Sequence, residues 1–289
     1  MQSRLFTIFM VMTIAPPLIQ QLQPRYISFR DVFKSRESKS KIYAWPAFTL
    51  GAILPEIPFS LFCGAIFFCC WYFGVGLPLG FPAGYVFLMI CLFEIFYVGF
   101  GQFIAAMAPN AMFASLLIPF FFLFIVAFCG IVVPYPALPH FWQSWMYWLT
   151  PFHYLLEGQL GVVTHNVPVV CDDTEFARFP PPPGMSCASY TDDFVKRMGG
   201  YVQAGAGGLC EFCQYANGDQ FAKGFNVFYR HRWRDFGFMW VYDAFNFMVV
   251  FFATWMFLGG AMKIKRALSP HDRRVAREQR RAAKRSSEG

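Results

Sequence analysis

The sequence predicts an all-α polytopic membrane protein with about five transmembrane helices, re-entrant or interfacial helices, and one disulfide-bonded extracellular loop. The 289 residues are 56% hydrophobic and 20% aromatic. Only 14% are charged, whereas soluble domains carry about 25% charged residues. Several apolar runs also reach the ~20 residues that a helix needs to cross a bilayer. A soluble core of this length could not bury so much apolar surface, so the chain is expected to lie in lipid.

Residues 1–22 contain the first expected transmembrane helix, whose apolar part is residues 5–22. Its length is near the minimum for ~30 Å of hydrocarbon, and Pro16 and Pro17 should kink or end it. Residues 23–46 are polar and basic, which fits either a short amphipathic surface helix or a solvated loop. Residues 47–133 contain three further spans, at 47–73, 83–107 and 111–133.

Residues 134–163 are apolar but broken by proline near their centre. Trp142, Trp145 and Trp148 recur there at helical spacing. Tryptophan and tyrosine favour the membrane interface, and a broken helix fits poorly as a lipid-exposed span. The segment is therefore predicted to form a pair of short re-entrant or interfacial helices.

Residues 164–235 have the composition of a small folded unit outside the membrane. They include four cysteines, at Cys171, Cys187, Cys210 and Cys213. An even number of loop cysteines outside the cytosol indicates disulfides, and three pairings are possible. Cys210-x-x-Cys213 could supply half of a zinc site. The chain has no second C-x-x-C there, so we expect no metal.

The last span is expected at residues 236–262, followed by a basic tail at 263–289. Ten Lys or Arg lie in that tail and six lie in residues 23–46. Four spans separate the two basic blocks, so the positive-inside rule puts both in the cytoplasm and the cysteine loop outside. The basic residues flank apolar spans, which favours a topology signal over nucleic-acid binding. We therefore expect a multi-pass protein, of the plasma membrane, with no nucleic-acid partner.

Two carboxylates interrupt the spans. Glu56 lies between Pro55 and Pro58, where it fits a helix-end carboxylate stabilised by the helix dipole, or else part of a coupling network. Glu94 lies deeper, where a charge is costly. We expect Glu94 to face the bundle and form a hydrogen bond, with proton or substrate chemistry as the alternative.

Several sequence blocks, in this order, resemble a known family. They are IQQLQPRYISFRDVFKSRESKSKIYAW, the Pro-Glu-Ile-Pro around Glu56, GQFIAAMAPNAMFASLLIPFFF, PFHYLLEG at 151–158, and the spaced cysteines. The chain resembles the C-terminal part of the second transmembrane domain, of ABC-2 type, in fungal pleiotropic drug resistance ABC transporters of the G subfamily. Such a domain has six spans, so we expect the first span to be absent and the domain to be truncated.

The resemblance implies how the chain would work. The loop after the first expected span would meet a nucleotide-binding domain, with Arg25, Arg36 and Glu37 as coupling residues. Hydrophobic small molecules would pass a cavity formed by the first and fourth expected spans. The residues expected to line it are Ser115, Phe120, Phe121, Phe124, Phe128, Thr7 and Met12. The family arrangement of disulfides would be nested, Cys171–Cys213 around Cys187–Cys210.

The chain has no G-x-x-x-x-G-K-[ST] phosphate loop, and its glycine-rich stretch at 204–208 lacks the following Lys-Ser/Thr. We therefore expect no enzyme activity and no cofactor in this chain. ATP and Mg²⁺ would bind to nucleotide-binding domains. Those domains, a first transmembrane domain and the bilayer are the expected partners. The predicted function is a transmembrane-domain fragment of an ATP-driven exporter of hydrophobic drugs or lipid-like compounds, forming cavity wall and outer lid. The alternative is a non-transporting truncated remnant or membrane scaffold.

Overall fold

A computed structural model describes residues 1–260 except 39, 41, 206 and 207. The basic tail expected at 263–289 and the end of the expected last span lie outside the described residues. The helices and strands follow one another as α1 (Gln2–Met12), α2 (Ala15–Val32), η1 (Phe33–Glu37), α3 (Trp45–Ile53), α4 (Glu56–Val75), α5 (Phe81–Met107), α6 (Ala111–Ala127), η2 (Tyr135–Ala137), α7 (His140–Leu149), α8 (Pro151–Thr164), β1 (Ala177–Phe179), α9 (Cys187–Met198), β2 (Tyr201–Ala204), β3 (Cys210–Cys213), α10 (Gly218–Gly224), η4 (Tyr229–His231), α11 (Arg232–Thr254) and η5 (Trp255–Gly260).

Four helical stretches are long and apolar enough to cross a bilayer. They are Gln2–Glu37, Trp45–Val75, Phe81–Met107 and Tyr229–Phe257, and Ala111–Ala127 is a fifth, shorter apolar helix. The predicted helical membrane fold is confirmed. The apolar surface of these helices needs no further cover in lipid, because hydrocarbon is as apolar as the side chains themselves.

The first helical stretch does not end where the sequence suggested. Pro16 and Pro17 fall in the first turn of α2, where a missing N–H donor costs little. The helix passes Pro24 and continues to Val32, then through η1 to Glu37. The segment expected to be a separate loop or surface helix is therefore mostly the continuation of the first span.

Two other boundaries also differ from expectation. The second span consists of two helices, α3 and α4. Pro55 has no N–H to continue the backbone hydrogen bonds of α3, and it occupies the N-cap position of α4. The fourth span was expected to reach residue 133, but α6 ends at Ala127. Gly130, with φ of +94°, then turns the chain toward η2. The pair of short helices expected at 141–163 is present as α7 and α8, broken at Thr150 and Pro151.

Helix α5 forms the centre of the bundle. In its most apolar window 61% of the residues are buried, against 33% or less in the other three candidate spans. It packs against α2, α4, α6, α8 and α11. The remaining spans therefore owe their mutual placement largely to this one helix.

Small residues let two neighbours approach α5 closely. A Cβ at Gly99 would stand 3.0 Å from Cβ of Asn246 on α11, and one at Gly101 would stand 3.1 Å from Ile19 on α2. Glycine allows such close helix contacts within membranes. Asn246 donates to the carbonyl of Phe96 at 3.3 Å, so a polar contact accompanies the close approach.

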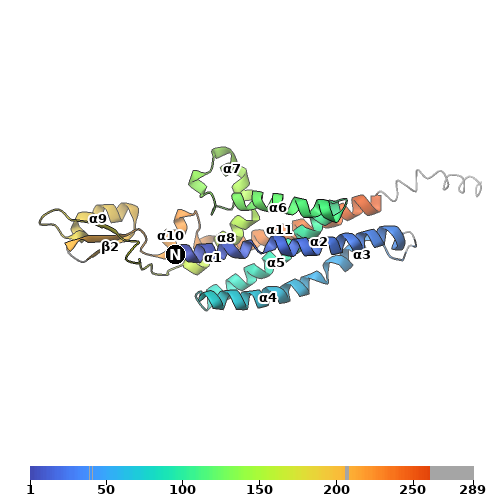
Figure 1. Cartoon of the computed structure of the whole chain (residues 1–289), viewed down its shortest axis with the longest axis horizontal. Coiled ribbons are helices and arrows are strands. Elements are labelled where there is room, and N and C mark those ends of the chain that lie inside the picture. The colour runs from blue at the N-terminus through green and yellow to red at the C-terminus, as the bar shows by residue number, and fades with distance from the viewer. Residues whose placement is uncertain (39, 41, 206–207, 261–289) are drawn as a thin grey trace, which may run out of the picture.

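The bundle and the cysteine-rich unit lie at different places along a long molecule. Figure 1 shows α9 and β2 at one end, and the turn between α2 and α3 at the opposite end. Strands β1, β3 and β2 form, in that order, an antiparallel sheet in which Ala177 pairs with Phe212 and Tyr201 pairs with Cys213. The fold thus places the cysteine-rich unit at the end of the molecule opposite the turn that follows α2.

The close approach at Gly101 gives a testable prediction. Gly101→Leu should lower the apparent melting temperature of the purified protein in detergent, because overpacking costs about 1–3 kcal/mol. Gly74→Leu on α4 is the matched control, since nothing lies within 4 Å of its Cβ position. Equal melting temperatures for the two variants would contradict the assigned packing of α2 against α5.

Candidate functional site

The polar end of α2 is fastened to the turn between α5 and α6 by Arg30. Its Nη1 donates to the carbonyl oxygens of Ala105 at 2.8 Å and Ala108 at 2.6 Å. Nη2 donates to the carbonyl of Pro109 at 3.2 Å. The side chain is 11% exposed. A guanidinium suits this position because the last carbonyls of a helix lack partners and carry partial negative charge. We call this set of contacts the Arg30 latch.

Arg25 links α2 to the start of α4. Its Nη1 lies 3.3 Å from Oε1 of Glu56, which stands in the first turn of α4. Arg25 is 62% exposed and Glu56 17% exposed, so the pair lies at the border of the bundle. This position agrees with the interpretation of Glu56 as a helix-end carboxylate. It also joins Glu56 to one of the residues expected to couple.

The other two expected coupling residues lie at the tip of the helical hairpin that α2, η1 and α3 form. Arg36 is exposed, while Glu37 accepts a hydrogen bond from the Tyr43 hydroxyl. Partial burial and the neighbouring Glu37 raise the pKa of Tyr43 to about 12, so the phenol remains a donor at neutral pH. Phe33 is buried beneath them and stacks on Phe48 with ring centroids 4.8 Å apart. The tip is therefore a packed element that presents Arg36.

The aromatic residues expected to line a substrate cavity lie mostly at the surface of α6. On α6, Phe120 is 65% exposed, Phe121 37% and Phe124 36%. Phe128 packs on Trp142 of α7 with ring centroids 5.1 Å apart, and the Ser115 hydroxyl donates to the Met112 carbonyl. Together the aromatics form an open stripe, which we call the α6 aromatic stripe.

Helix α1 carries the other two residues expected to line the substrate cavity, Thr7 and Met12. Met12 is fully buried in the hydrophobic core, so it supports the bundle from within. The Thr7 hydroxyl donates to the carbonyl of Ser3 at 2.7 Å. Helix α1 packs against α8, and among the described residues Thr7 forms no hydrogen bond with the α6 aromatic stripe.

A buried ionic cluster, which sequence reasoning did not assign, joins α8 to the start of α11. Glu157 is 2% exposed, and its Oε1 accepts from Nδ1 of His231 at 2.7 Å. Its Oε2 accepts from Nη2 of Arg234 at 2.7 Å, and Arg234 also contacts the buried Asp235 at 2.9 Å. His153, one turn before Glu157, lies 3.4 Å from the same Oε2. The i, i+4 spacing of His153 and Glu157 was the signal available in the sequence.

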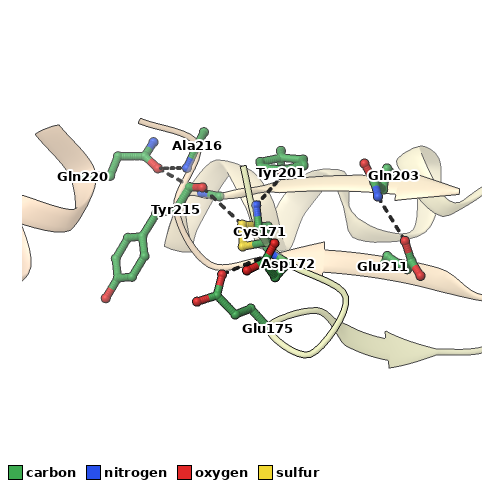
Figure 2. The surroundings of a disulfide bond; sticks show 11 residues. Cys171, Asp172, Glu175, Tyr201, Gln203, Glu211, Tyr215, Ala216 and Gln220 are labelled. Carbon is green, nitrogen blue, oxygen red and sulfur yellow. Dashed lines mark hydrogen bonds between the residues drawn. A yellow bond between two sulfur atoms is a disulfide. The ribbon is translucent and has the colours of Figure 1, made fainter. Parts of the chain in front are cut away.

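The four loop cysteines form the nested disulfides that the family resemblance implied. Cys171 pairs with Cys213, and Cys187 pairs with Cys210. Figure 2 shows the first of these bonds, where the Cys171 amide donates to the Tyr201 hydroxyl at 3.3 Å. The pairing separates Cys210 from Cys213 into different bonds, so these two are not available as a zinc pair. No cluster of metal-ligand side chains occurs among the described residues.

The buried cluster predicts a specific loss of stability. Glu157→Ala should destabilise the α8–α11 contact by about 1–3 kcal/mol, because Arg234 and His231 lose the carboxylate that accepts from them. Hydrogen exchange at the start of α11 should then quicken, and the melting temperature should fall. Glu175→Ala, which removes an exposed carboxylate of the cysteine-rich unit, should change neither measurement. Protection unchanged in Glu157→Ala would contradict a stabilising role for the cluster.

Comparison with known proteins identifies relatives over most of the chain. A family model described as ABC-2 type transporter matches residues 1–163. The chain is 41% identical over 254 residues to ABC multidrug transporter G of Aspergillus fumigatus, covering 87% of this chain and 19% of that protein. It is 38% identical over 264 residues to the Brefeldin A resistance protein of Schizosaccharomyces pombe, covering 89% and 17%. For ABC multidrug transporter SNQ2 of Candida glabrata the identity is 34% over 249 residues, covering 85% and 16%. The chain thus spans less than a fifth of the length of these curated relatives.

Proposed function

Because the chain belongs to the ABC-2 type transporter family, we propose that it forms part of the transmembrane domain of an ATP-driven exporter. The substrates would be hydrophobic drugs or lipid-like compounds. ATP and Mg²⁺ would be bound by nucleotide-binding domains, and this chain would supply part of the membrane wall. A first transmembrane domain would face it across the substrate path.

The observation that best supports this proposal is the continuous helical stretch from Gln2 to Glu37 with the Arg30 latch near its polar end. A nucleotide-binding domain that pressed on Arg36, Glu37 and Arg25 would move the end of α2. Through Arg30 the same motion would reach the turn between α5 and α6. Discrete packed contacts of this kind can transmit a change between two arrangements.

The α6 aromatic stripe supports the substrate part of the proposal. Phe120, Phe121 and Phe124 expose flat apolar rings on one helix, and such rings bind bulky apolar compounds by area burial and offset stacking. Ser115 and Thr7 would add hydroxyls at the rim, and Met12 would support α1 from behind. A facing membrane domain would close the open stripe into a cavity.

The orientation follows from the same proposal. The polar tip with Arg36 would lie in the cytoplasm, where nucleotide-binding domains are found, and the disulfide-bonded unit would lie outside the plasma membrane. Disulfides persist in that oxidising compartment. The cysteine-rich unit would then form an outer lid above the substrate path.

A reconstitution experiment tests the proposal. The chain would be placed in vesicles with a companion protein, made from the Aspergillus fumigatus relative by removing the segment aligned to this chain. We expect ATP-dependent efflux of a lipophilic dye only when both are present. Correct insertion of both without efflux would contradict the proposal and favour a non-transporting scaffold.

Within that assay, paired variants test the coupling residues. Arg36→Glu should reduce ATP-dependent efflux at least about tenfold, because a loss of charge-assisted contacts worth more than 1.4 kcal/mol has that effect. Arg197→Glu, an exposed arginine on α9, makes the same charge change at the opposite end. Efflux reduced equally by both variants, or by neither, would remove the assigned role of Arg36.

A further inference from the structure

We propose that a cavity between α2, α4 and α5 binds a lipophilic amine, with Glu94 as the counter-ion of the protonated amino group. The site is separate from the α6 aromatic stripe and from Arg36 and Glu37, whereas Arg25, the third residue assigned to coupling, lies on its lining. It is a binding site on this chain alone and does not depend on the proposed export. The ligand class is an alkyl or aralkyl amine that is soluble in the bilayer.

The cavity has the size and shape of a small-molecule site. Its volume is about 450 Å³, within the range of about 300–1,000 Å³ usual for ligand pockets. Its apolar walls include Ile14 and Leu18 from α2 and Phe59 and Phe67 from α4. Phe59 is 63% exposed, so the cavity opens on the outer surface of the bundle, where a ligand dissolved in lipid can enter.

Glu94 is a carboxyl within the helix bundle that lines this cavity. It lies at the middle of α5, is 8% exposed and lines the cavity. The hydrogen bond expected for it from the sequence is absent, since within the described part of the chain no hydrogen-bond or ion-pair partner contacts it. A carboxyl at this depth is costly without a partner. Its stem lies against Gly64 of α4, where a Cβ would stand 2.8 Å from Cγ of Glu94.

Tyr97 provides a second unsatisfied polar group beside the first. It is 6% exposed and lines the same cavity. Its buried hydroxyl has no hydrogen-bond partner among the described residues. Tyr97 follows Glu94 by three positions on α5, so both side chains lie on neighbouring parts of one helix face. The Glu94 carboxyl would accept from the N–H donors of an ammonium group, and Tyr97 contributes to the cavity wall next to it.

The charges around the cavity favour a cation over an anion or a neutral alcohol. The charged residues of the lining are Arg25, Glu56 and Glu94. Arg25 already pairs with Glu56 at 3.3 Å, so Glu94 is the carboxyl left without a counter-ion. A protonated amine would form a charge-assisted hydrogen bond with Glu94, and its hydrocarbon part would cover the apolar walls.

A photolabelling experiment on the intact chain in lipid nanodiscs tests the site. The probe is a dodecylamine that carries a diazirine on its alkyl chain, and mass spectrometry locates the labelled residues. We expect saturable labelling at Phe59, Cys63 and Phe67. Excess dodecylamine should abolish the labelling and dodecanol should not. Equal competition by the alcohol would overturn the proposed role of charge. Labelling spread without saturation over the exposed Phe62 and Ile66 would show ordinary lipid contact and overturn the site.

Substitutions then test whether Glu94 binds the amino group of the probe. Glu94→Gln keeps the side-chain shape and should weaken saturable labelling at least about tenfold, as expected for loss of a charge-assisted hydrogen bond. Tyr97→Phe should weaken it less. Glu175→Gln makes the same chemical change on the cysteine-rich unit and should leave labelling intact. Unchanged labelling in a folded Glu94→Gln protein would overturn the proposal. If that variant does not insert, the comparison of amine and alcohol on the unaltered chain decides the question.

Discussion

The packing of α5 against its neighbours is the constraint on which the rest of the bundle depends. In lipid there is no hydrophobic driving force for the association of helices, so close packing and polar contacts must hold them together. Gly99 and Gly101 provide the close fit to α11 and α2. Gln102 and Asn246 provide polar contacts, by donating to the carbonyls of Ala52 and Phe96. The outer helices can remain apolar and exposed because α5 packs against α2, α4, α6, α8 and α11.

Charged groups cluster toward the ends of this bundle, and each cluster fixes a different junction. The Arg30 latch holds the polar end of α2 to the turn between α5 and α6. At the other end, Glu157 holds α8 to the start of α11, close to the cysteine-rich unit. Motion imposed at the polar tip would therefore enter a bundle in which charged side chains fix both ends, through backbone carbonyls at one end and carboxylates at the other. Glu94 differs from both clusters because, within the described part of the chain, no hydrogen-bond or ion-pair partner contacts it.

The sequence predicted the membrane-spanning helices well because a helix that crosses the bilayer needs a long run of apolar residues, which hydropathy detects. It misplaced the end of the first helical stretch, which was expected at residue 22 because residues 23–46 are polar and basic, whereas α2 continues to Val32. The family resemblance supplied the nested disulfides, which spacing alone leaves open among three pairings. The contacts of Glu157 with His231 and Arg234 and those of Arg30 with residues 105–109 join distant parts of the chain. No local pattern encodes such pairs. The cavity beside Glu94 likewise arises from three helices at once.

We propose that the polar tip of the α2–α3 hairpin and the disulfide-bonded unit lie on opposite sides of a membrane. Cysteine accessibility measures this directly. Ser40→Cys at the tip and Asp173→Cys on the cysteine-rich unit would each be introduced singly and treated with a membrane-impermeant maleimide on intact cells. We expect Asp173→Cys to react from outside the cell and Ser40→Cys to react only after the membrane is opened. Reaction of both positions from the same side would contradict the transmembrane arrangement.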